Sequence, residues 1–415
     1  MEIGIIGMGA MGKMYAKKLA DSGYKINGGD IPERVDDLKR EFEGQNVDIL
    51  KDGIAVSRRS DLIFYSVPAG EIENTVRQYG PSTKLGAIVG GHTSVKTPEI
   101  EAFEKYLPRD NHIVTSHSLH APSVDPLGQT MVAVNHRSSE SAYQTALDIF
   151  GKLGSKIVEM NYADHDKATA DTQAVTHLGF LSMGTAWRKM GGRPWENGTY
   201  VGGIDNTKLL MMLRIHGGTP HVYSGLAILN PHARMQVKQY SDSVSDLFGM
   251  MISGRENEFR TRIQEAASNF VQTESPILLD DELLGEYSLA GSGSERKPNS
   301  HLSLLTMVDA WHKLGINPYD NLVCKTPPFK LRLGIAEYLF RTPDLLEESL
   351  DAAINNMDLR TDDHQFSKAV LEWASVIEHK DIKAYHKKFE RNRKHFEDKI
   401  DEGKELSGKL IEKLP

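Results

Sequence analysis

Strand-like and helix-like patterns alternate through the first part of the chain. The run Glu2–Ile6 is short and rich in β-branched residues, which is typical of a buried strand, and an amphipathic helical pattern follows it. Further short apolar runs recur downstream, and helical segments separate them. The predicted strands after the first are 24–29, 61–68, 87–90, 112–115, 131–134 and 156–160. Strands that alternate with helices predict an α/β fold with a Rossmann-like, doubly wound sheet.

Helical spacing of the apolar residues dominates from residue 163 onward. The predicted helices are 169–190, 237–251, 302–314, 331–338 and 345–354. We therefore expect two domains, an α/β domain over residues 1–162 and an all-helical domain over residues 163–415. The segment 382–413 is heavily charged, with aromatic residues at irregular intervals, and we expect a solvated terminal helix there.

Composition and charge narrow the class of protein. The chain has 415 residues, with 49 Lys and Arg against 57 Asp and Glu, and its net charge of −8 argues against nucleic-acid binding. No apolar run approaches the ~20 residues that span a bilayer, and no basic leader or cleavage site precedes the first strand. The single cysteine, Cys324, excludes an intramolecular disulfide and a cysteine-based zinc site. We therefore expect a cytoplasmic protein with no nucleic-acid or membrane partner.

A glycine-rich loop follows the first predicted strand and opens a predicted helix. Gly7, Gly9 and Gly12 have the G-x-G-x-x-G spacing, in which the first glycine permits a tight turn and the second lets backbone approach a pyrophosphate. The third allows the helix to pack closely on the strand, and the helix N-terminus offers free N–H groups to the phosphates. The context predicts a dinucleotide-binding domain. The loop residues expected to contact the cofactor are Gly7, Met8, Gly9, Ala10, Met11 and Gly12.

The residues after the second and third predicted strands bear on which dinucleotide binds. Asp30 ends the second strand, where a carboxylate accepts hydrogen bonds from a ribose 2′-hydroxyl and favours NAD. The same residue is equally well placed to cap the helix behind Pro32. Arg34 would then be free to pair with the 2′-phosphate of NADP. The third strand ends in further residues expected at the cofactor, which are Ser66, Val67 and Pro68.

Three polar clusters could supply chemistry: residues 91–96, residues 116–122, and residues 164–166 with 173–178. The first two follow strands, and ligands of open α/β sheets bind at the carboxyl ends of strands. His117 and His120 are three residues apart in a loop, with no carboxylate at helical ligand spacing and no cysteine nearby. We therefore expect no metal.

Two polar residues interrupt apolar helical runs in the second domain. His177 is either a hydrogen-bonded core histidine or a ligand-binding residue, and its spacing does not decide between them. Arg214 lies within an otherwise apolar run, and a buried guanidinium requires an anionic partner. That partner is either a protein carboxylate or a carboxylate of the substrate. These residues suggest a nicotinamide-dependent dehydrogenase that acts on an anionic substrate.

Together these motifs resemble the prephenate dehydrogenase family, and its fungal branch in particular. The resemblance covers nearly the whole chain apart from the charged tail. The segments that carry it are 7–12, 92–96, 116–120, 164–166, 170–178, 214–215, 230–231 and 298–305.

The resemblance implies oxidative decarboxylation of prephenate to 4-hydroxyphenylpyruvate, on the route to tyrosine, by an enzyme whose helical domain builds a homodimer. It also implies that His117 accepts a hydrogen bond from the substrate hydroxyl, with Ser94 helping to hold both. By the same resemblance His177 and Arg214 bind substrate. The chain departs from the bacterial pattern at His120, a substrate-pocket residue that competes with His117 as the base. For an unperturbed histidine the rate would fall at acid pH near ~6.5.

The residues and the resemblance disagree about the cofactor. Asp30 favours NAD, whereas the fungal branch uses NADP, and we predict NADP with NAD as the alternative. A β-hydroxyacid dehydrogenase is a rival enzyme class, for which Lys167 is the candidate acid–base group. A non-catalytic dinucleotide sensor would keep the glycine loop but would not need Ser94, His117 and Arg214 together.

Overall fold

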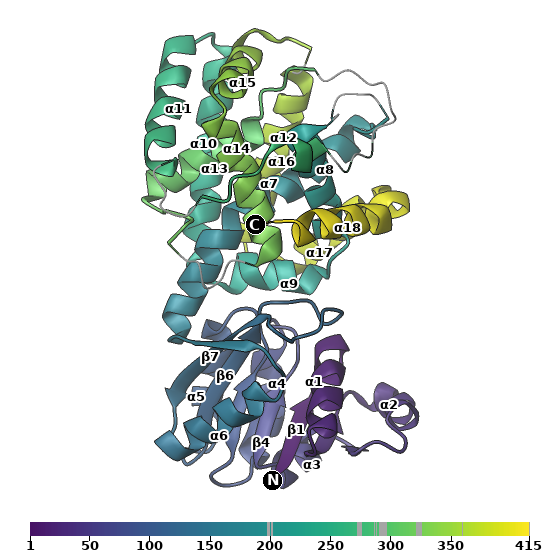
Figure 1. The fold of residues 1–415 in the computed structure, drawn as a ribbon. Coiled ribbons are helices and arrows are strands. Elements are labelled where there is room, and N and C mark those ends of the chain that lie inside the picture. The colour runs from purple at the N-terminus through teal and green to yellow at the C-terminus, as the bar shows by residue number, and fades with distance from the viewer. Residues whose placement is uncertain are drawn as a thin grey trace. The chain divides into compact units, whose positions relative to one another are not determined.

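The protein is described by a computed structural model, shown in Figure 1. The described residues are 1–196, 200, 202–271, 276–285, 287, 289, 297–320, 326–358 and 360–414. Cys324 lies outside them. The chain divides into two compact units: unit 1 is Met1–Ala168 with Leu229–Pro231, and unit 2 is Thr169–Ile228 with His232–Pro415. The division falls inside α7 (Tyr162–Met190) rather than at residue 162, because the first turns of this helix belong to unit 1.

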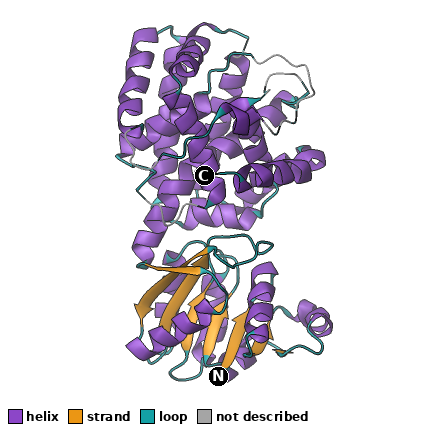
Figure 2. Cartoon of the chain, in the orientation of Figure 1, coloured by secondary structure: helices purple, strands orange, loops and turns teal. Residues whose placement is uncertain are grey.

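Unit 1 is built on one sheet, which Figure 2 shows in orange. Its strands are β1 (Glu2–Ile6), β2 (Lys25–Gly29), β3 (Val47–Ile49), β4 (Leu62–Tyr65), β5 (Ile88–Gly91), β6 (His112–Ser118), β7 (Thr130–Arg137) and β8 (Lys156–Glu159). Their order is β3-β2-β1-β4-β5-β6-β7-β8. The pairs are parallel except β6 with β7, which is antiparallel. The first six strands follow the Rossmann order, and the predicted fold class is confirmed.

Helices pack on both faces of this sheet. They are α1 (Ala10–Asp21), η1 (Pro32–Arg34), α2 (Val35–Glu41), α3 (Gly53–Arg59), α4 (Ile72–Tyr79), η2 (Gly80–Ser82), α5 (Thr97–Tyr106) and α6 (Glu140–Gly151). Because successive strand residues face opposite sides, Ile5 joins the cluster that contains Leu19 of α1, whereas Ile6 joins the one that contains Val56 of α3. The short strand β3 was not predicted, since its three residues carry too little apolar signal.

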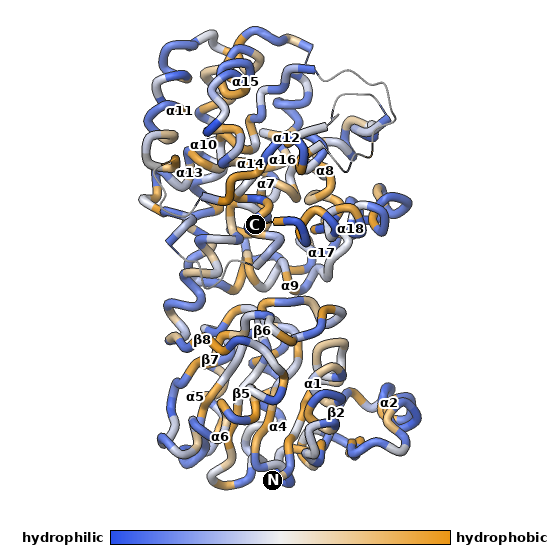
Figure 3. The backbone as a smooth tube through the Cα atoms, in the orientation of Figure 1, coloured by the Kyte–Doolittle hydropathy of each residue, from blue (hydrophilic) through white to orange (hydrophobic). Residues whose placement is uncertain are grey.

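Unit 2 is helical throughout its described elements, as predicted. After α7 come α8 (Gly203–His216), α9 (Pro220–Ser224), η3 (Gly225–Leu229), α10 (Ala233–Ile252), α11 (Glu256–Phe270), α12 (Asp281–Gly285), α13 (Leu302–Leu314), α14 (Pro327–Arg341), α15 (Pro343–Asn355), α16 (Arg360–Glu378), α17 (Ile382–His395) and α18 (Glu397–Glu412). Exposed helices such as α11 are largely polar in Figure 3. Among the described residues, no helix combines the length and apolarity needed to cross a membrane.

The charged C-terminal segment is not a solvated helix, and that expectation is wrong. It forms α17 and α18, and their apolar residues Tyr385, Phe389 and Phe396 are fully buried. A Cβ on Gly403 of α18 would lie 2.7 Å from the Leu213 side chain, so α18 and α8 pack very closely. The surface charges hide a conventional apolar stripe that ties the segment to unit 2.

Candidate active site

The glycine loop joins β1 to α1 with the geometry that its spacing predicts. Gly7 has a φ of +98°, and a Cβ there would lie 2.4 Å from the Ser66 carbonyl oxygen. A Cβ on Gly12 would lie 2.1 Å from the Gly7 carbonyl oxygen, so only glycine lets α1 start this close to the loop. A Cβ on Gly9, by contrast, would have nothing within 4 Å among the described residues. The backbone is therefore open at the N-terminus of α1, which suits a pyrophosphate group.

Asp30 and Arg34 do not separate as the NADP hypothesis required. One Asp30 oxygen, Oδ2, accepts hydrogen bonds from the Met8 N–H at 2.7 Å and from Arg34 Nη1 at 2.8 Å. The other oxygen accepts from the Ile31 N–H, and Arg34 Nη2 donates to the Met8 carbonyl at 3.0 Å. The N-cap of η1 is Ile31, and no side chain caps this helix. The N-cap hypothesis for Asp30 is therefore wrong.

This pairing changes the argument about the dinucleotide. The Asp30 carboxylate is neutralised by Arg34, and both of its oxygens already accept hydrogen bonds, so it is poorly placed to select a free ribose hydroxyl. Arg34 is 39% exposed and uses two of its five N–H donors, which leaves donors for a phosphate. The local geometry thus suits a 2′-phosphate without any movement of Asp30.

The other strand ends of this sheet edge complete the region around the glycine loop. Ser66 donates its N–H to the Ile6 carbonyl at 2.7 Å, and residues 66–68 are half-buried beside the loop. His92, just after β5, lies against Tyr15 of α1 with ring centroids 3.8 Å apart. Both of its ring nitrogens are buried and have no hydrogen-bond partner in the described part of the chain. Orphaned polar atoms of this kind fit a site that a polar ligand completes.

His117 lies near the end of β6 at the head of a hydrogen-bonded chain. Its Nδ1 is 2.8 Å from Nε2 of His165, and Nδ1 of His165 is 2.8 Å from Oδ1 of Asp166. Asp166 also accepts the backbone N–H groups of Lys96 and Thr97, each at 2.7 Å. The three side chains come from β6 and the first turns of α7, so the sheet topology brings them together within unit 1.

The hydrogen-bond network assigns the tautomers along this chain. Burial raises the pKa of Asp166, but the hydrogen bonds from His165, Lys96 and Thr97 outweigh it and hold that pKa below its usual value. Ionised Asp166 accepts the His165 Nδ1–H, so His165 Nε2 accepts the Nδ1–H of His117. Nε2 of His117 then carries no proton and is free to accept one. The arrangement is the relay of a general base.

The electrostatics of the site keep His117 neutral. Burial lowers the pKa of His117 well below 6.5, and His165, Lys96, His120 and His92 lower it further. The expectation that the rate falls near pH ~6.5 is therefore wrong, and the acid limb lies well below that value.

His165 and Asp166 were not assigned a role from sequence, although both lie in the polar cluster at 164–166. Both are fully buried. The ion pair between Lys96 and Glu99, at 2.8 Å and also fully buried, supports the same region. Lys96 Nζ donates to the Ser116 carbonyl at 2.7 Å and so connects the loop after β5 to β6.

The structure leaves two of the expected residues outside this chain. Ser94 is half-buried and has no hydrogen bond to His117 or to any other described residue. His120 Nδ1 lies 3.0 Å from the Ala121 carbonyl oxygen and does not contact the relay. Of the two competing histidines, only His117 has a partner that sets its tautomer.

The remaining expected residues belong to unit 2. His177 is 7% exposed and meets Tyr223 edge to face, with ring centroids 4.9 Å apart. Arg214 Nη1 donates to the Lys404 carbonyl and the Ser407 hydroxyl, both at 3.3 Å. Neither partner is charged, and no described carboxylate pairs with Arg214. The alternative of a protein carboxylate as its partner is thus not supported.

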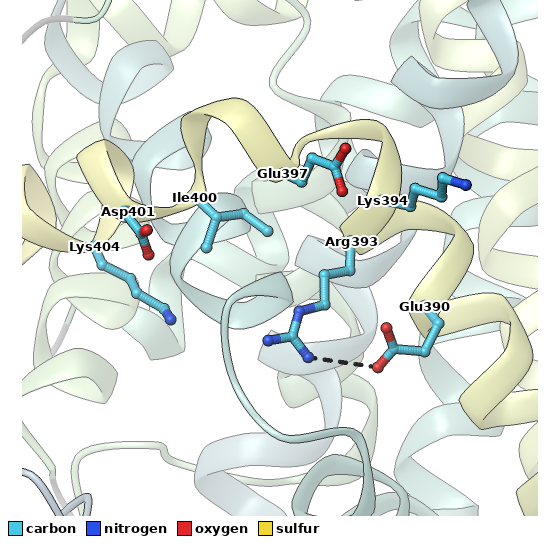
Figure 4. A pocket seen from close by; sticks show the side chains of 7 residues that line it. All are labelled: Glu390, Arg393, Lys394, Glu397, Ile400, Asp401 and Lys404. Carbon is cyan, nitrogen blue, oxygen red and sulfur yellow. Dashed lines mark ion pairs between the residues drawn. The ribbon is translucent and has the colours of Figure 1, made fainter.

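A surface pocket on α17 and α18 contains none of these residues (Figure 4). Its volume is about 480 Å³, and Arg393 and Glu390 in its wall form an ion pair at 3.5 Å. The lining residues are Glu390, Arg393, Lys394, Glu397, Ile400, Asp401 and Lys404. Because acidic and basic side chains balance here, the pocket has no charge preference for an anionic substrate.

Comparison with known proteins places the chain. Residues 174–415 match the family model of a 6-phosphogluconate dehydrogenase C-terminal domain, and residues 2–89 match NADP oxidoreductase coenzyme F420-dependent. The chain is 42% identical to the probable prephenate dehydrogenase (NADP(+)) of Schizosaccharomyces pombe, over 100% of this chain and 97% of that protein. The chain belongs to the prephenate dehydrogenase family. The family resemblance predicted from the motifs is confirmed.

A second relative of the prephenate dehydrogenase family agrees with this assignment. The prephenate dehydrogenase (NADP(+)) of Saccharomyces cerevisiae is 45% identical, over 99% of this chain and 93% of that protein. The solved structure of prephenate dehydrogenase from Aquifex aeolicus is 18% identical, covers 62% of this chain and 95% of its own, and has a TM-score of 0.49. The family model of the C-terminal domain extends over α17 and α18, in keeping with their burial in unit 2.

Proposed function

We propose that this protein is an NADP-dependent prephenate dehydrogenase, which oxidatively decarboxylates prephenate to 4-hydroxyphenylpyruvate in tyrosine biosynthesis. Identity of 42% and 45% to two proteins of that name, over essentially the whole chain, supports the reaction class. The observation that carries the mechanism is the His117–His165–Asp166 chain, because it supplies a base with a defined tautomer.

His117 acts as the base in this proposal. Its Nε2 accepts the proton of the ring hydroxyl as the carbon bearing that hydroxyl gives up its hydride. NADP, when bound, accepts that hydride. Carbon dioxide then leaves with its bonding electrons retained by the ring, which becomes a phenol, and aromatisation makes the sequence favourable. His165 and Asp166 stabilise the imidazolium that forms at His117. Ser94 helps to orient the hydroxyl, and His120 lines the substrate pocket.

The residues of unit 1 that fit NADP are those of the glycine loop, Arg34 and the segment after β4. The open backbone at Gly9 receives the pyrophosphate, and Arg34, with Asp30 behind it, pairs with the 2′-phosphate. Ser66, Val67 and Pro68 line the adjoining strand end. The unpartnered His92 nitrogens provide a further polar contact for the cofactor.

Arg214 and His177 bind the anionic substrate in this proposal. Arg214 contacts only neutral groups among the described residues, so a substrate carboxylate supplies its missing counter-charge. His177 is kept neutral, because burial and the charge of Arg332 lower its pKa well below 6.5. It therefore offers a hydrogen bond without adding a charge.

A turnover assay tests the proposal. The protein is mixed with prephenate and either NADP or NAD, and the absorbance of the reduced nicotinamide is followed, with His117→Asn as the control. We expect turnover with prephenate that is faster with NADP. A protein that instead oxidises a β-hydroxyacid would favour the rival enzyme class, although the exposure of Lys167 on α7 argues against it. Cofactor binding without turnover of any substrate would indicate a sensor.

We also propose that the protein is a cytoplasmic homodimer. The buried apolar helices of unit 2 are of the type that builds dimers in this family. Light scattering coupled to size-exclusion chromatography would give about twice the 46.2 kDa chain mass. A monomer at working concentration would contradict the assembly but not the activity.

A further inference from the structure

Arg332 of α14 is a buried cation without a counter-ion. It is 3% exposed, and its Nε is buried with no hydrogen-bond partner. No described residue forms an ion pair with it. An unpaired buried charge is costly, and proteins retain one mainly where a ligand completes it.

Other buried cations of this chain do have carboxylate partners. Lys208 pairs with Asp205 at 2.8 Å, and Arg262 forms two hydrogen bonds of 2.8 Å with Asp309. The buried carboxylate on the same helix as Arg332, Glu337, is already engaged: it accepts the backbone N–H groups of Ile277 and Leu278 and the Tyr319 hydroxyl. Arg332 is therefore an exception within its own unit.

The surroundings of Arg332 are those of an anion site. Arg214 on α8 and Tyr223 on α9 both interact with it electrostatically, and His177 on α7 is near enough for the Arg332 charge to lower its pKa. Burial and the Arg214 charge lower the pKa of Arg332 to about 10, so it stays charged at neutral pH. Two guanidinium groups thus share one neighbourhood of unit 2, and no carboxylate of the described residues compensates either.

We propose that Arg332 and Arg214 together recognise a dicarboxylate, each pairing with one carboxylate, and that Arg332 makes the site select a keto acid over its amino-acid counterpart. The inference rests on the proposed function, since prephenate carries two carboxylates attached to one ring carbon and its side chain. In arogenate an ammonium replaces the keto oxygen beside one of those carboxylates. That ammonium would be repelled by a buried guanidinium and would lower the net charge from two negative to one.

Arg332→Gln tests this inference, with Arg341→Gln on the same helix as the matched control. Arg341 is 31% exposed and lies near Glu337 rather than Arg214. We expect Arg332→Gln to raise KM for prephenate about 10- to 100-fold, the span for a lost charge-assisted hydrogen bond. The preference for prephenate over arogenate in kcat/KM should fall by a similar factor, while KM for NADP stays unchanged. The control should leave all three values unchanged.

A second measurement does not depend on turnover. Thermal unfolding with and without prephenate, in the absence of NADP, should show a stabilising shift in the wild type that Arg332→Gln abolishes. The ligand-free variant should melt no lower than the wild type, because an unpaired buried charge has been removed.

The outcomes separate this inference from the proposed function. Wild type that turns over prephenate, together with an Arg332→Gln variant of unchanged KM and substrate preference, would overturn the inference alone. A wild type inactive with prephenate would overturn both. A variant that unfolds, or that loses its self-association, would show that Arg332 pairs within the protein or with a second copy, and would also overturn it.

Discussion

Removing the His165 imidazole should disconnect His117 from its carboxylate without touching the cofactor or the substrate. His165 joins the two through hydrogen bonds of 2.8 Å on either side. In His165→Ala the Nδ1–H of His117 has no acceptor, and its tautomer is no longer set. We therefore expect a defect in the chemical step.

The magnitude follows from the bond that is lost. A hydrogen bond to a charged group contributes about 1.5–3 kcal/mol, and His117 becomes charged only as it takes the substrate proton. Since ~1.36 kcal/mol corresponds to a tenfold change in rate, kcat should fall about 10- to 150-fold. KM for prephenate should change little, because the interaction strengthens in the transition state rather than in the bound ground state.

The pH profile supplies a second readout. The His165 charge is one of the causes that lower the pKa of His117, so its removal should move the acid limb of kcat/KM toward neutral pH. Initial rates with saturating NADP across the acid range would measure this shift. His165→Gln is the matched control: its amide oxygen can accept the His117 Nδ1–H, and part of the lost rate should return.

Two results would refute the reasoning. If His165→Ala keeps a normal kcat and an unshifted acid limb, the chain is structural only. The relay also requires that His165→Ala adds little to His117→Asn, because the two act as a unit. Fully multiplicative losses in the double variant would show that they act independently. Melting curves of each variant would establish that the fold is intact.

Three further predictions address the base, the cofactor and stability. His117→Asn should lower kcat by about two to four orders of magnitude, and an intact rate there with a dead His120→Asn would transfer the role to His120. Arg34→Ala should raise KM for NADP markedly and leave NAD almost unchanged; equal effects on both would exclude a phosphate contact. Burial raises the pKa of Asp363 from 3.8 to about 7, so its stabilising protonated form is lost as pH rises through 7, by at most about 4 kcal/mol. Asp363→Asn should therefore melt above the wild type at pH ~8.5 and converge with it near pH ~4, and equal melting curves throughout would contradict the shift.

Much of the fold was predictable because it depends on neighbours in the chain. The run Glu2–Ile6, the glycine spacing after it and the helix through Leu19 are local signals, and they form β1, the loop and α1 as expected. The three-residue strand β3 carries no such signal, and its pairing with β2 exists only in the assembled sheet. The antiparallel step between β6 and β7 was likewise beyond the local pattern.

The site divides along the same line. His117 was identifiable from the motif around it, but its partner His165 lies 48 residues further along the chain and is brought to it by the meeting of β6 and α7. Asp30 and Arg34 were noticed individually, yet only the folded loop shows that they pair with each other and with Met8.

The sequence by itself determined the fold class, the family and the residue types available for chemistry, because local backbone preferences and motif spacing are properties of adjacent residues. The tertiary structure alone decided the tautomer and pKa of His117, the burial of α17 and α18, and the isolation of Arg332 from any described carboxylate. Hydrogen bonding, desolvation and charge pairing depend on distances between residues that are remote in the chain, and those distances exist only after folding.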